Sequence, residues 1–159
     1  KMIIYSLEVL KNELIKIYDQ DSEDYKEVYI NLVHYVGKDW KDYVKVQDDC
    51  YHRDVYYSCD KFDMVIITWG PGQKCPIHNH PVNGCFVKLL RGSITEERYE
   101  PFTLKKTKEA THIETHIFYI DDSFGYHKMS NLEKNPCVSL HIYAPGNYKP
   151  VIFEETAVQ

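Results

Sequence analysis

Length, composition and charge limit what this chain can be. Its 159 residues have the length of one ordinary domain, so we expect residues 1–159 to fold around a single core. The formal net charge is -5, and no Lys/Arg run is longer than Lys105-Lys106, which argues against nucleic acid and anionic membranes as partners. We therefore expect a small-molecule partner.

Neither the start of the chain nor its cysteines indicate a secreted protein. The apolar stretch within residues 1–16 is too short for the core of a signal peptide or for a bilayer span. The 5 cysteines are odd in number and irregularly spaced, which favours reduced thiols over a disulfide framework. We expect a cytoplasmic protein, and we expect it to be a monomer.

The first part of the chain has the spacing of apolar residues, three and four apart, that is typical of amphipathic helices. This spacing predicts one helix over Ser6 to Ile17 and a second over Tyr25 to Val36, ended by Gly37. A short third helix is predicted over Asp39 to Val44. The predicted N-caps are Ser6 for the first helix and Asp21 or Ser22 for the second. Residues 1–47 are thus expected to form a helical cap without chemistry of its own.

From residue 48 onward the pattern changes to short β-branched and aromatic runs separated by turn residues. The runs are residues 54–58, 62–69, 85–90, 93–100, 110–120, 126–130, 137–144 and 150–154. About eight strands around one ligand-sized core fit a closed barrel better than a flat sheet with exposed edges. The expected fold class is mainly β, with a small β-barrel or jelly roll over residues 48–159 that shares one domain with the N-terminal helical cap.

Two histidines stand one residue apart in the run from Gly72 to Cys85. On an extended segment, residues i and i+2 share a face, so His78 and His80 point to one side while Asn79 points away. An isolated histidine is more often a structural residue than a ligand. An H-x-H pair on a barrel strand, however, predicts a metal site.

The residues around this pair resemble the first cupin motif. Gly72, His78, His80 and Gly92 have the spacing of that motif, and Cys85 stands at the position that cupins usually give to a glutamate. The resemblance implies a cupin fold, in agreement with the predicted small barrel. It also implies that His78 and His80 are metal ligands.

The second cupin motif contributes a histidine with an asparagine four residues later, and His127 with Asn131 matches it. His127 is thereby implied as the third ligand. Over most of its length the chain resembles the cysteine dioxygenase family of thiol dioxygenases. The resemblance is carried by Tyr51-His52-Arg53, Trp69-Gly70, Ile77 to His80, Gly84 to Gly92, Asp121 to Ser123 before His127, and Ser139 to Pro145.

Family resemblance assigns expected roles to eight residues. It implies that ferrous iron is held by His78, His80 and His127. The other implied roles are a thioether cross-link between Cys85 and Tyr143, contact of Tyr51 and Arg53 with the substrate carboxylate, and a place for His141 beside the iron site. The implied activity is that of an iron(II)-dependent cysteine dioxygenase, which converts L-cysteine and O2 to L-cysteine sulfinate.

Physical reasons support these roles. Three neutral imidazoles leave the iron its full charge, so a substrate thiolate can supply the anion that a carboxylate ligand provides elsewhere. The Arg53 guanidinium can pair bidentately with a carboxylate. Related enzymes that act on 3-mercaptopropionate carry glutamine near this position, so Arg53 favours cysteine. His141 and Tyr143 alternate on one predicted strand and therefore share a face.

The sequence leaves alternatives open. The same chemistry could act on another small thiol, such as 3-mercaptopropionate or cysteamine. A non-catalytic metal-binding cupin would also use three histidines. A zinc or nickel isomerase of the same fold would do so too, because a three-histidine site does not by itself choose its metal.

Two further features are interpreted as unrelated to the metal. His112 and His116 have the spacing of a zinc pair on a helix, but the alternation of apolar and polar residues around them predicts a strand with both histidines on an outer face. Cys75 is close to His78 in the sequence, yet Pro76 intervenes, and we interpret this cysteine as a plain buried or surface thiol.

Overall fold

The structure is a computed structural model that describes residues 2–20 and 25–153. The helices are α1 (Leu7–Tyr18), α2 (Lys26–His34) and the 3-10 helices η1 (Asp39–Tyr43) and η2 (Asp122–Phe124). The strands are β1 (His52–Ser58), β2 (Asp63–Trp69), β3 (Ile77–His78), β4 (Cys85–Arg91), β5 (Ile94–Tyr99), β6 (Lys106–His112), β7 (Ile117–Ile120), β8 (Tyr126–Ser130), β9 (Cys137–Tyr143) and β10 (Ile152–Phe153).

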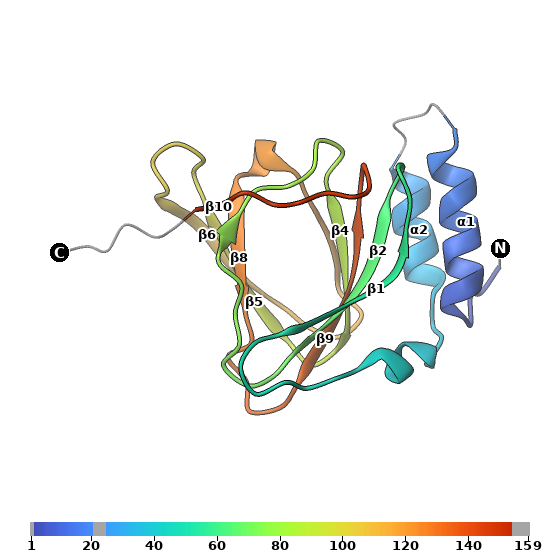
Figure 1. Cartoon of the computed structure of the whole chain (residues 1–159), viewed down its shortest axis with the longest axis horizontal. Helices are drawn as coiled ribbons and strands as arrows, with labels where there is room; N and C mark the ends of the chain where they lie inside the picture. The colour runs from blue at the N-terminus through green and yellow to red at the C-terminus, as the bar shows by residue number, and fades with distance from the viewer. Residues whose placement is uncertain (1, 21–24, 154–159) are drawn as a thin grey trace.

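The strands form two antiparallel sheets that face each other across a barrel (Figure 1). One sheet has the order β1-β2-β9-β4-β7, and the other has the order β10-β3-β8-β5-β6. Helices α1 and α2 lie side by side against the outer face of the first sheet (Figure 1). The predicted barrel with an N-terminal helical part is thereby confirmed.

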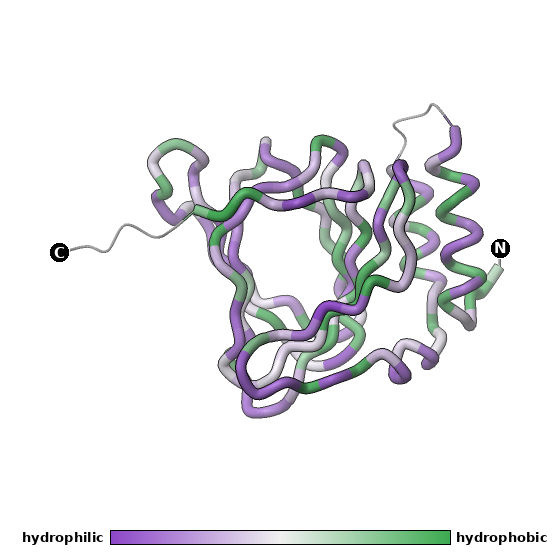
Figure 2. Tube along the Cα trace, in the orientation of Figure 1, coloured by the Kyte–Doolittle hydropathy of each residue, from purple (hydrophilic) through white to green (hydrophobic). Residues whose placement is uncertain are grey.

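The inner strands of the sheet beneath the helices, β2, β4 and β9, are buried on both faces along most of their length. In β9, Leu140 and Ile142 pack under the helices, whereas His141 and Tyr143 line a cavity inside the barrel. The strands beside the helices are hydrophobic over long stretches (Figure 2). Burial of both faces explains these nearly continuous apolar runs. The helical part therefore protects the back of the sheet that presents half of the cavity wall.

Lys88 fastens the helices to the barrel. Its side chain leaves β4 on the outer face of the sheet and is buried. The Nζ atom donates hydrogen bonds to the backbone carbonyls of Leu32 and Tyr35, at 2.6 Å each. These carbonyls belong to the C-terminal end of α2, where helix carbonyls lack partners and a cation is favourable.

The start of the first helix agrees with the sequence prediction. Ser6 caps α1, since its Oγ accepts the backbone N–H of Val9 at 3.1 Å. The alternative caps for the second helix, Asp21 and Ser22, lie outside the described residues. No helix in the described part of the chain is both long and apolar enough to cross a lipid bilayer.

Three predicted elements differ from the observed ones. Helix α2 ends at His34, short of the predicted Val36, because Tyr35 is extended and pairs with Ile4 in a parallel bridge. The third helix is of the 3-10 type. The run over 110–120 is two strands, because the chain turns at residues 113–116, where Thr115 has a positive φ of 71°. The prediction of one continuous strand with outward histidines is therefore wrong.

Candidate metal centre and cavity

Three histidines meet on the inner side of the second sheet. His78 on β3 is paired directly with His127 on β8, and His80 follows two residues after His78. One nitrogen of each ring lies within 4.8 Å of the corresponding nitrogens of the other two. The predicted H-x-H pair and the predicted third ligand are therefore neighbours in space.

Hydrogen bonds determine which nitrogen of His78 and His127 faces the cluster. Carbonyl and carboxylate oxygens only accept, so His78 Nδ1 donates to the Pro76 carbonyl (2.8 Å) and His127 Nδ1 donates to Glu96 Oε2 (2.7 Å). The Nε2 atom of each neutral ring then carries a lone pair. These two Nε2 atoms are 3.1 Å apart. Two lone pairs that face each other repel unless a proton or a metal ion lies between them.

His80 completes the set. Asp122 Oδ1 lies 3.1 Å from His80 Nδ1 and also accepts the His80 backbone N–H at 2.7 Å. The remaining nitrogen, Nε2, is buried and has no hydrogen-bond partner among the described residues. An unpaired buried acceptor is costly, and a metal ion would remove that cost. Three converging imidazole lone pairs fit a transition-metal ion.

Burial keeps two of these imidazoles neutral. It lowers the pKa of His78 to about 3, with a further contribution from the His127 ring. The same causes hold the pKa of His80 far below its ordinary value. Burial opposes the ionisation of Glu96, but hydrogen bonds from His112 and His127 outweigh it and lower the pKa of this carboxyl. The nitrogens are therefore free to bind metal without first losing a proton.

Glu96 and Asp122 contact two of the three histidines, and the sequence assigned a role to neither carboxylate. Glu96 lies on β5 with 1% of its surface exposed, in phase with the buried Ile94. The sequence did contain one indication of a special role for Glu96, because a carboxylate on the apolar face of a strand needs a buried partner. Asp122 opens the 3-10 helix η2, and nothing in its local sequence indicated a histidine partner.

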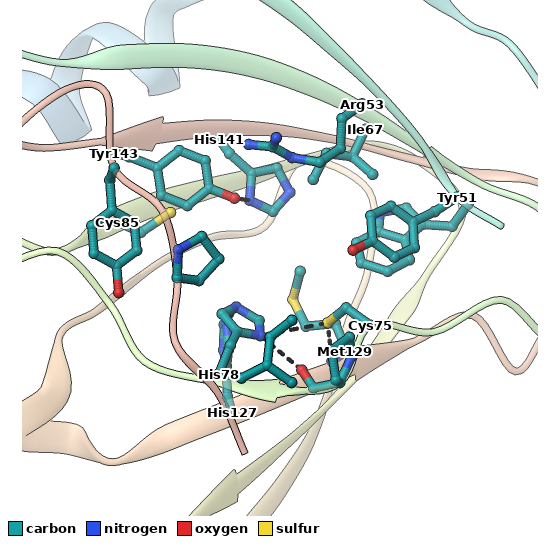
Figure 3. Close-up of a pocket in the computed structure, with 15 residues that line it drawn as sticks. Tyr51, Arg53, Ile67, Cys75, His78, Cys85, His127, Met129, His141 and Tyr143 are labelled. Carbon is teal, nitrogen blue, oxygen red and sulfur yellow. Dashed lines mark hydrogen bonds between the residues drawn. The ribbon is translucent and has the colours of Figure 1, made fainter. Parts of the chain in front are cut away.

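A cavity of about 180 Å³ opens beside the histidines, inside the barrel (Figure 3). It is lined by Tyr51, Arg53, Ile67, Trp69, Cys75, Pro76, His78, Cys85, His127, Met129, His141, Tyr143, Tyr148, Pro150 and Ile152. All residues predicted for the site line this cavity except His80. The volume suits a small molecule.

Arg53 and Tyr51 lie across the cavity from His78 and His127 (Figure 3). They share a face because they are two residues apart on extended chain. Tyr51 packs on Trp69, with 4.8 Å between the ring centroids. Arg53 is the only permanently charged side chain among the described residues that line the cavity.

A row of hydrogen bonds orients Tyr143. Trp69 Nε1 donates to Ser139 Oγ (2.9 Å), and the Ser139 hydroxyl shares a hydrogen bond with His141 Nε2 (2.7 Å). The other ring nitrogen, His141 Nδ1, shares a hydrogen bond with the Tyr143 hydroxyl (3.2 Å). Burial raises the pKa of Tyr143 well above its ordinary value, so the phenol keeps its own proton. The phenol is therefore held at the cavity wall in its protonated form.

Cys85 lies next to Tyr143. The two residues are directly opposite each other in the β4–β9 pairing, so their side chains project on the same face. Figure 3 shows the Cys85 sulfur beside the Tyr143 ring. Burial raises the pKa of the Cys85 thiol. The pairing thus brings a thiol and a phenol ring together at the cavity wall.

Cys75 is a cavity residue, which the sequence interpretation as a plain thiol did not anticipate. Its Sγ accepts the Met129 backbone N–H at 3.2 Å and lies 3.8 Å from His78 Nδ1. Burial raises the pKa of this thiol to about 11. Cys75 therefore stays protonated at neutral pH, and its position gives no indication that it is a metal ligand.

The segment 148–153, which we call the strap, closes one side of the cavity. Its cavity-lining residues are Tyr148, Pro150 and Ile152. Asn79, between the first two histidines, holds the strap, since its Oδ1 accepts hydrogen bonds from the Tyr148 hydroxyl and from the Val151 N–H (2.8 Å). The residue that points away from the metal centre thus fixes the cavity wall.

Solved structures of similar shape place this fold among the cupins. An uncharacterized conserved protein with a double-stranded β-helix domain from Klebsiella pneumoniae matches with a TM-score of 0.60 and 19% identity, covering 72% of this chain and 94% of that one. A cupin superfamily protein from Desulfitobacterium hafniense matches with a TM-score of 0.56 and 7% identity, covering 68% and 89%. The fold is thus the double-stranded β-helix that cupins share, and the three-histidine cluster inside it is a candidate metal centre.

Sequence comparisons place the chain more narrowly. The family described as cysteine dioxygenase type I matches residues 4–155. Cysteine dioxygenase type 1 of Danio rerio is 31% identical over 150 residues, which are 88% of this chain and 75% of that protein. The Rattus norvegicus protein of the same name is 33% identical over 141 residues, 83% and 70% of the two chains. The chain belongs to the cysteine dioxygenase type I family.

Proposed function

We propose that this protein is an iron(II)-dependent dioxygenase that adds both atoms of O2 to the sulfur of L-cysteine and gives L-cysteine sulfinate. Family membership supports the reaction class. The observation that supports a bound metal is the convergence of imidazole lone pairs at His78, His80 and His127. The Nε2 atoms of His78 and His127 are 3.1 Å apart.

These three histidines would hold the iron. When bound, ferrous iron supplies Lewis acidity and one-electron chemistry that bring a thiolate and dioxygen into reaction. Because the protein ligands are neutral, the substrate thiolate can supply the missing negative charge. Glu96 and Asp122 keep the rings of His127 and His80 oriented and make them better electron donors.

Arg53 selects the substrate by charge. No carboxylate is among the described residues that line the cavity, so a substrate bearing only an ammonium group would meet an uncompensated guanidinium. This disfavours cysteamine. A carboxylate pairs with the Arg53 fork, and Tyr51 lies on the same wall. The closest rival, 3-mercaptopropionate, also carries a carboxylate.

The Tyr143 phenol would orient the reacting group by a hydrogen bond. The phenol is protonated and is held by the His141 ring, so it can hydrogen-bond to the reacting group in the cavity. We further propose that the Cys85 sulfur bonds to a ring carbon of Tyr143, with loss of the thiol and ring hydrogens to O2 as the two-electron oxidant. The thioether would fix the phenol and remove a competing thiol. Intact mass lower by about two hydrogens, with the two segments joined in a peptide map, is expected. A free Cys85 thiol in fully active protein would refute the cross-link.

The five free cysteines fit a reducing compartment, and the proposal is of a cytoplasmic enzyme that acts as a monomer without nucleic-acid or membrane partners. A non-catalytic metal-binding cupin is the alternative of another class. It predicts metal uptake without oxygen consumption.

Oxygen uptake by the anaerobically purified, iron-loaded protein tests the proposal. Uptake should be strongest with L-cysteine, weaker with 3-mercaptopropionate and weakest with cysteamine, and mass spectrometry should identify the sulfinate. His127→Ala should lose iron and turnover together. Uptake with none of the three thiols would contradict the proposal and leave a binding cupin or the chemistry of another metal.

Arg53→Gln tests the clamp separately. Loss of charge-assisted hydrogen bonds worth about 1.5 to 3 kcal/mol should raise KM for L-cysteine roughly 10- to 100-fold, with iron content unchanged. Arg91→Gln, which removes a guanidinium that packs on Trp40 outside the cavity, is the matched control. An unchanged KM in Arg53→Gln would remove Arg53 from the substrate site.

A further inference from the structure

A second pair of histidines lies outside the cavity, at the turn between β6 and β7. The turn at residues 113–116, with Thr115 at a φ of 71° and a hydrogen bond from His116 N to Ile113 O (3.0 Å), folds His116 back over His112. The two Nδ1 atoms are 2.9 Å apart. Two histidines that a continuous strand would hold apart are therefore in contact.

The hydrogen bonds of His112 leave a lone pair on the nitrogen that faces His116. His112 Nε2 lies 3.1 Å from Glu96 Oε1, and an ionised carboxylate only accepts, so His112 donates its proton there. The Nδ1 atom of neutral His112 is then unprotonated. In the metal-free protein, this lone pair can accept a hydrogen bond from the Nδ1–H of His116.

The environment of His112 is that of a metal-binding histidine. Its ring is buried and stacked on Phe118, with 3.9 Å between centroids and 18° between planes. The buried Glu96 carboxylate accepts the proton of Nε2, the ring nitrogen that does not face His116. Histidines that bind metals usually have such a partner on the nitrogen that does not bind the metal. His116, by contrast, is exposed, so its ring can adjust and water can complete the coordination. A tetrahedral ion with metal–nitrogen distances near 2.0 to 2.1 Å needs about 3.3 Å between nitrogens, a small movement of His116.

We propose that His112 and His116 form a second metal site, for a divalent ion such as Zn²⁺ that favours imidazole nitrogen. Two protein ligands and water would hold the ion, at a site open to solvent. Glu96 would then be the outer-sphere partner of both centres, with Oε2 on His127 and Oε1 on His112. This proposal does not depend on the reaction catalysed at the first centre.

Zinc titration of the iron-loaded protein by calorimetry tests the second site. Iron content is measured afterwards, so that zinc bound in place of iron is subtracted. The intact protein should bind one zinc ion beyond the iron centre, and His116→Ala should weaken that binding about tenfold or more while keeping its iron. His34→Ala, at the end of α2, removes a histidine elsewhere and should bind as the intact protein does.

Two results would overturn the second site. One is the absence of any zinc binding beyond the iron centre, which would mean that the two imidazoles only share a hydrogen bond. The other is equal zinc affinity in the intact protein and His116→Ala. Because His116 is exposed and touches neither the cavity nor the three-histidine cluster, this substitution is expected to leave folding and cysteine turnover intact.

Discussion

The nitrogen that faces away from the centre decides what each histidine can do. Pro76, Asp122 and Glu96 each supply an oxygen that accepts one ring proton and leaves the other nitrogen as a donor atom for metal. The spacing of His78, His80 and His127 was visible in the sequence. The carboxylate partners Glu96 and Asp122 were not, because β5 and η2 meet the histidines only through the closure of the barrel.

Removing the charge of Glu96 should weaken the centre. In Glu96→Gln the amide is a poorer acceptor for His127 Nδ1–H, so His127 becomes a weaker ligand. Iron affinity, measured by equilibrium dialysis, should fall about 10- to 100-fold. Glu97→Gln, which removes the neighbouring carboxylate that pairs with Lys106 and Lys128, is the control. Equal iron affinity in both variants would show that Glu96 does not support the ligand.

Buried neutral histidines should make the metal-free protein sensitive to acid. Burial lowers the pKa of His78 to about 3 and that of His80 still further, whereas the unfolded chain takes up protons near its ordinary pKa of about 6.5. Below that pH the unfolded state binds more protons, so the free energy of unfolding decreases as pH falls. Each such histidine contributes about 1.4 kcal/mol per pH unit.

Denaturant unfolding of the metal-free protein at pH 7.5 and pH 5.5 measures this effect. A variant with His78→Ala and His80→Ala should lose less stability between the two pH values than the intact metal-free protein does. The same decrease in both proteins would mean that other groups cause the acid sensitivity.

At the scale of elements, one short strand serves both the metal centre and the cavity wall. β3 pairs with β8 through His78 and His127, and with β10 through His78 and Ile152. The sequence predicted an extended segment at His78 and a strand over residues 150–154, but neither the two-residue length of β3 nor its pairing with the strap. Such short strands carry too few residues for alternation to be recognised.

Asn79→Ala should loosen the strap without touching the histidines. The substitution removes two hydrogen bonds to Tyr148 and Val151, worth about 1 kcal/mol each. We expect KM for L-cysteine to rise roughly five- to tenfold with iron content unchanged, and longer thiols such as homocysteine to be oxidised relatively better. Steady-state oxygen uptake measures both. Asn83→Ala, in the next loop, is the control, and equal behaviour of the two variants would contradict a clamping role.

Across the whole molecule, most of the architecture followed from the spacing of apolar residues. Amphipathic spacing predicted α1 and α2, and alternating or continuous apolar runs predicted most strands of both sheets. The prediction of one strand over 110–120 was wrong because Ile113, Thr115 and Ile117 alternate with polar residues as in a strand, although Thr115 adopts a positive φ. Local alternation does not report a turn that is stabilised from outside the segment, here by the Thr115 N–H to Leu89 O bond of 2.9 Å.

The cavity is the junction of the two sheets, and this explains why its residues are so dispersed in the chain. Arg53 comes from β1, His141 and Tyr143 from β9, and His78 and His127 from the opposite sheet. Family resemblance assigned these residues to one site without information on the fold. Family resemblance did not assign Cys75 or the strap to the site. Their position at the cavity wall depends on the closure of the barrel.

Isotope labelling tests the central claim most directly. The iron-loaded protein is supplied with L-cysteine under ¹⁸O2 in unlabelled water, and the product is examined by mass spectrometry. A dioxygenase that combines thiolate and O2 at the three-histidine centre predicts a sulfinate in which both new oxygen atoms are ¹⁸O. A product with one labelled atom, with oxygen from water, or a disulfide without added oxygen would contradict it.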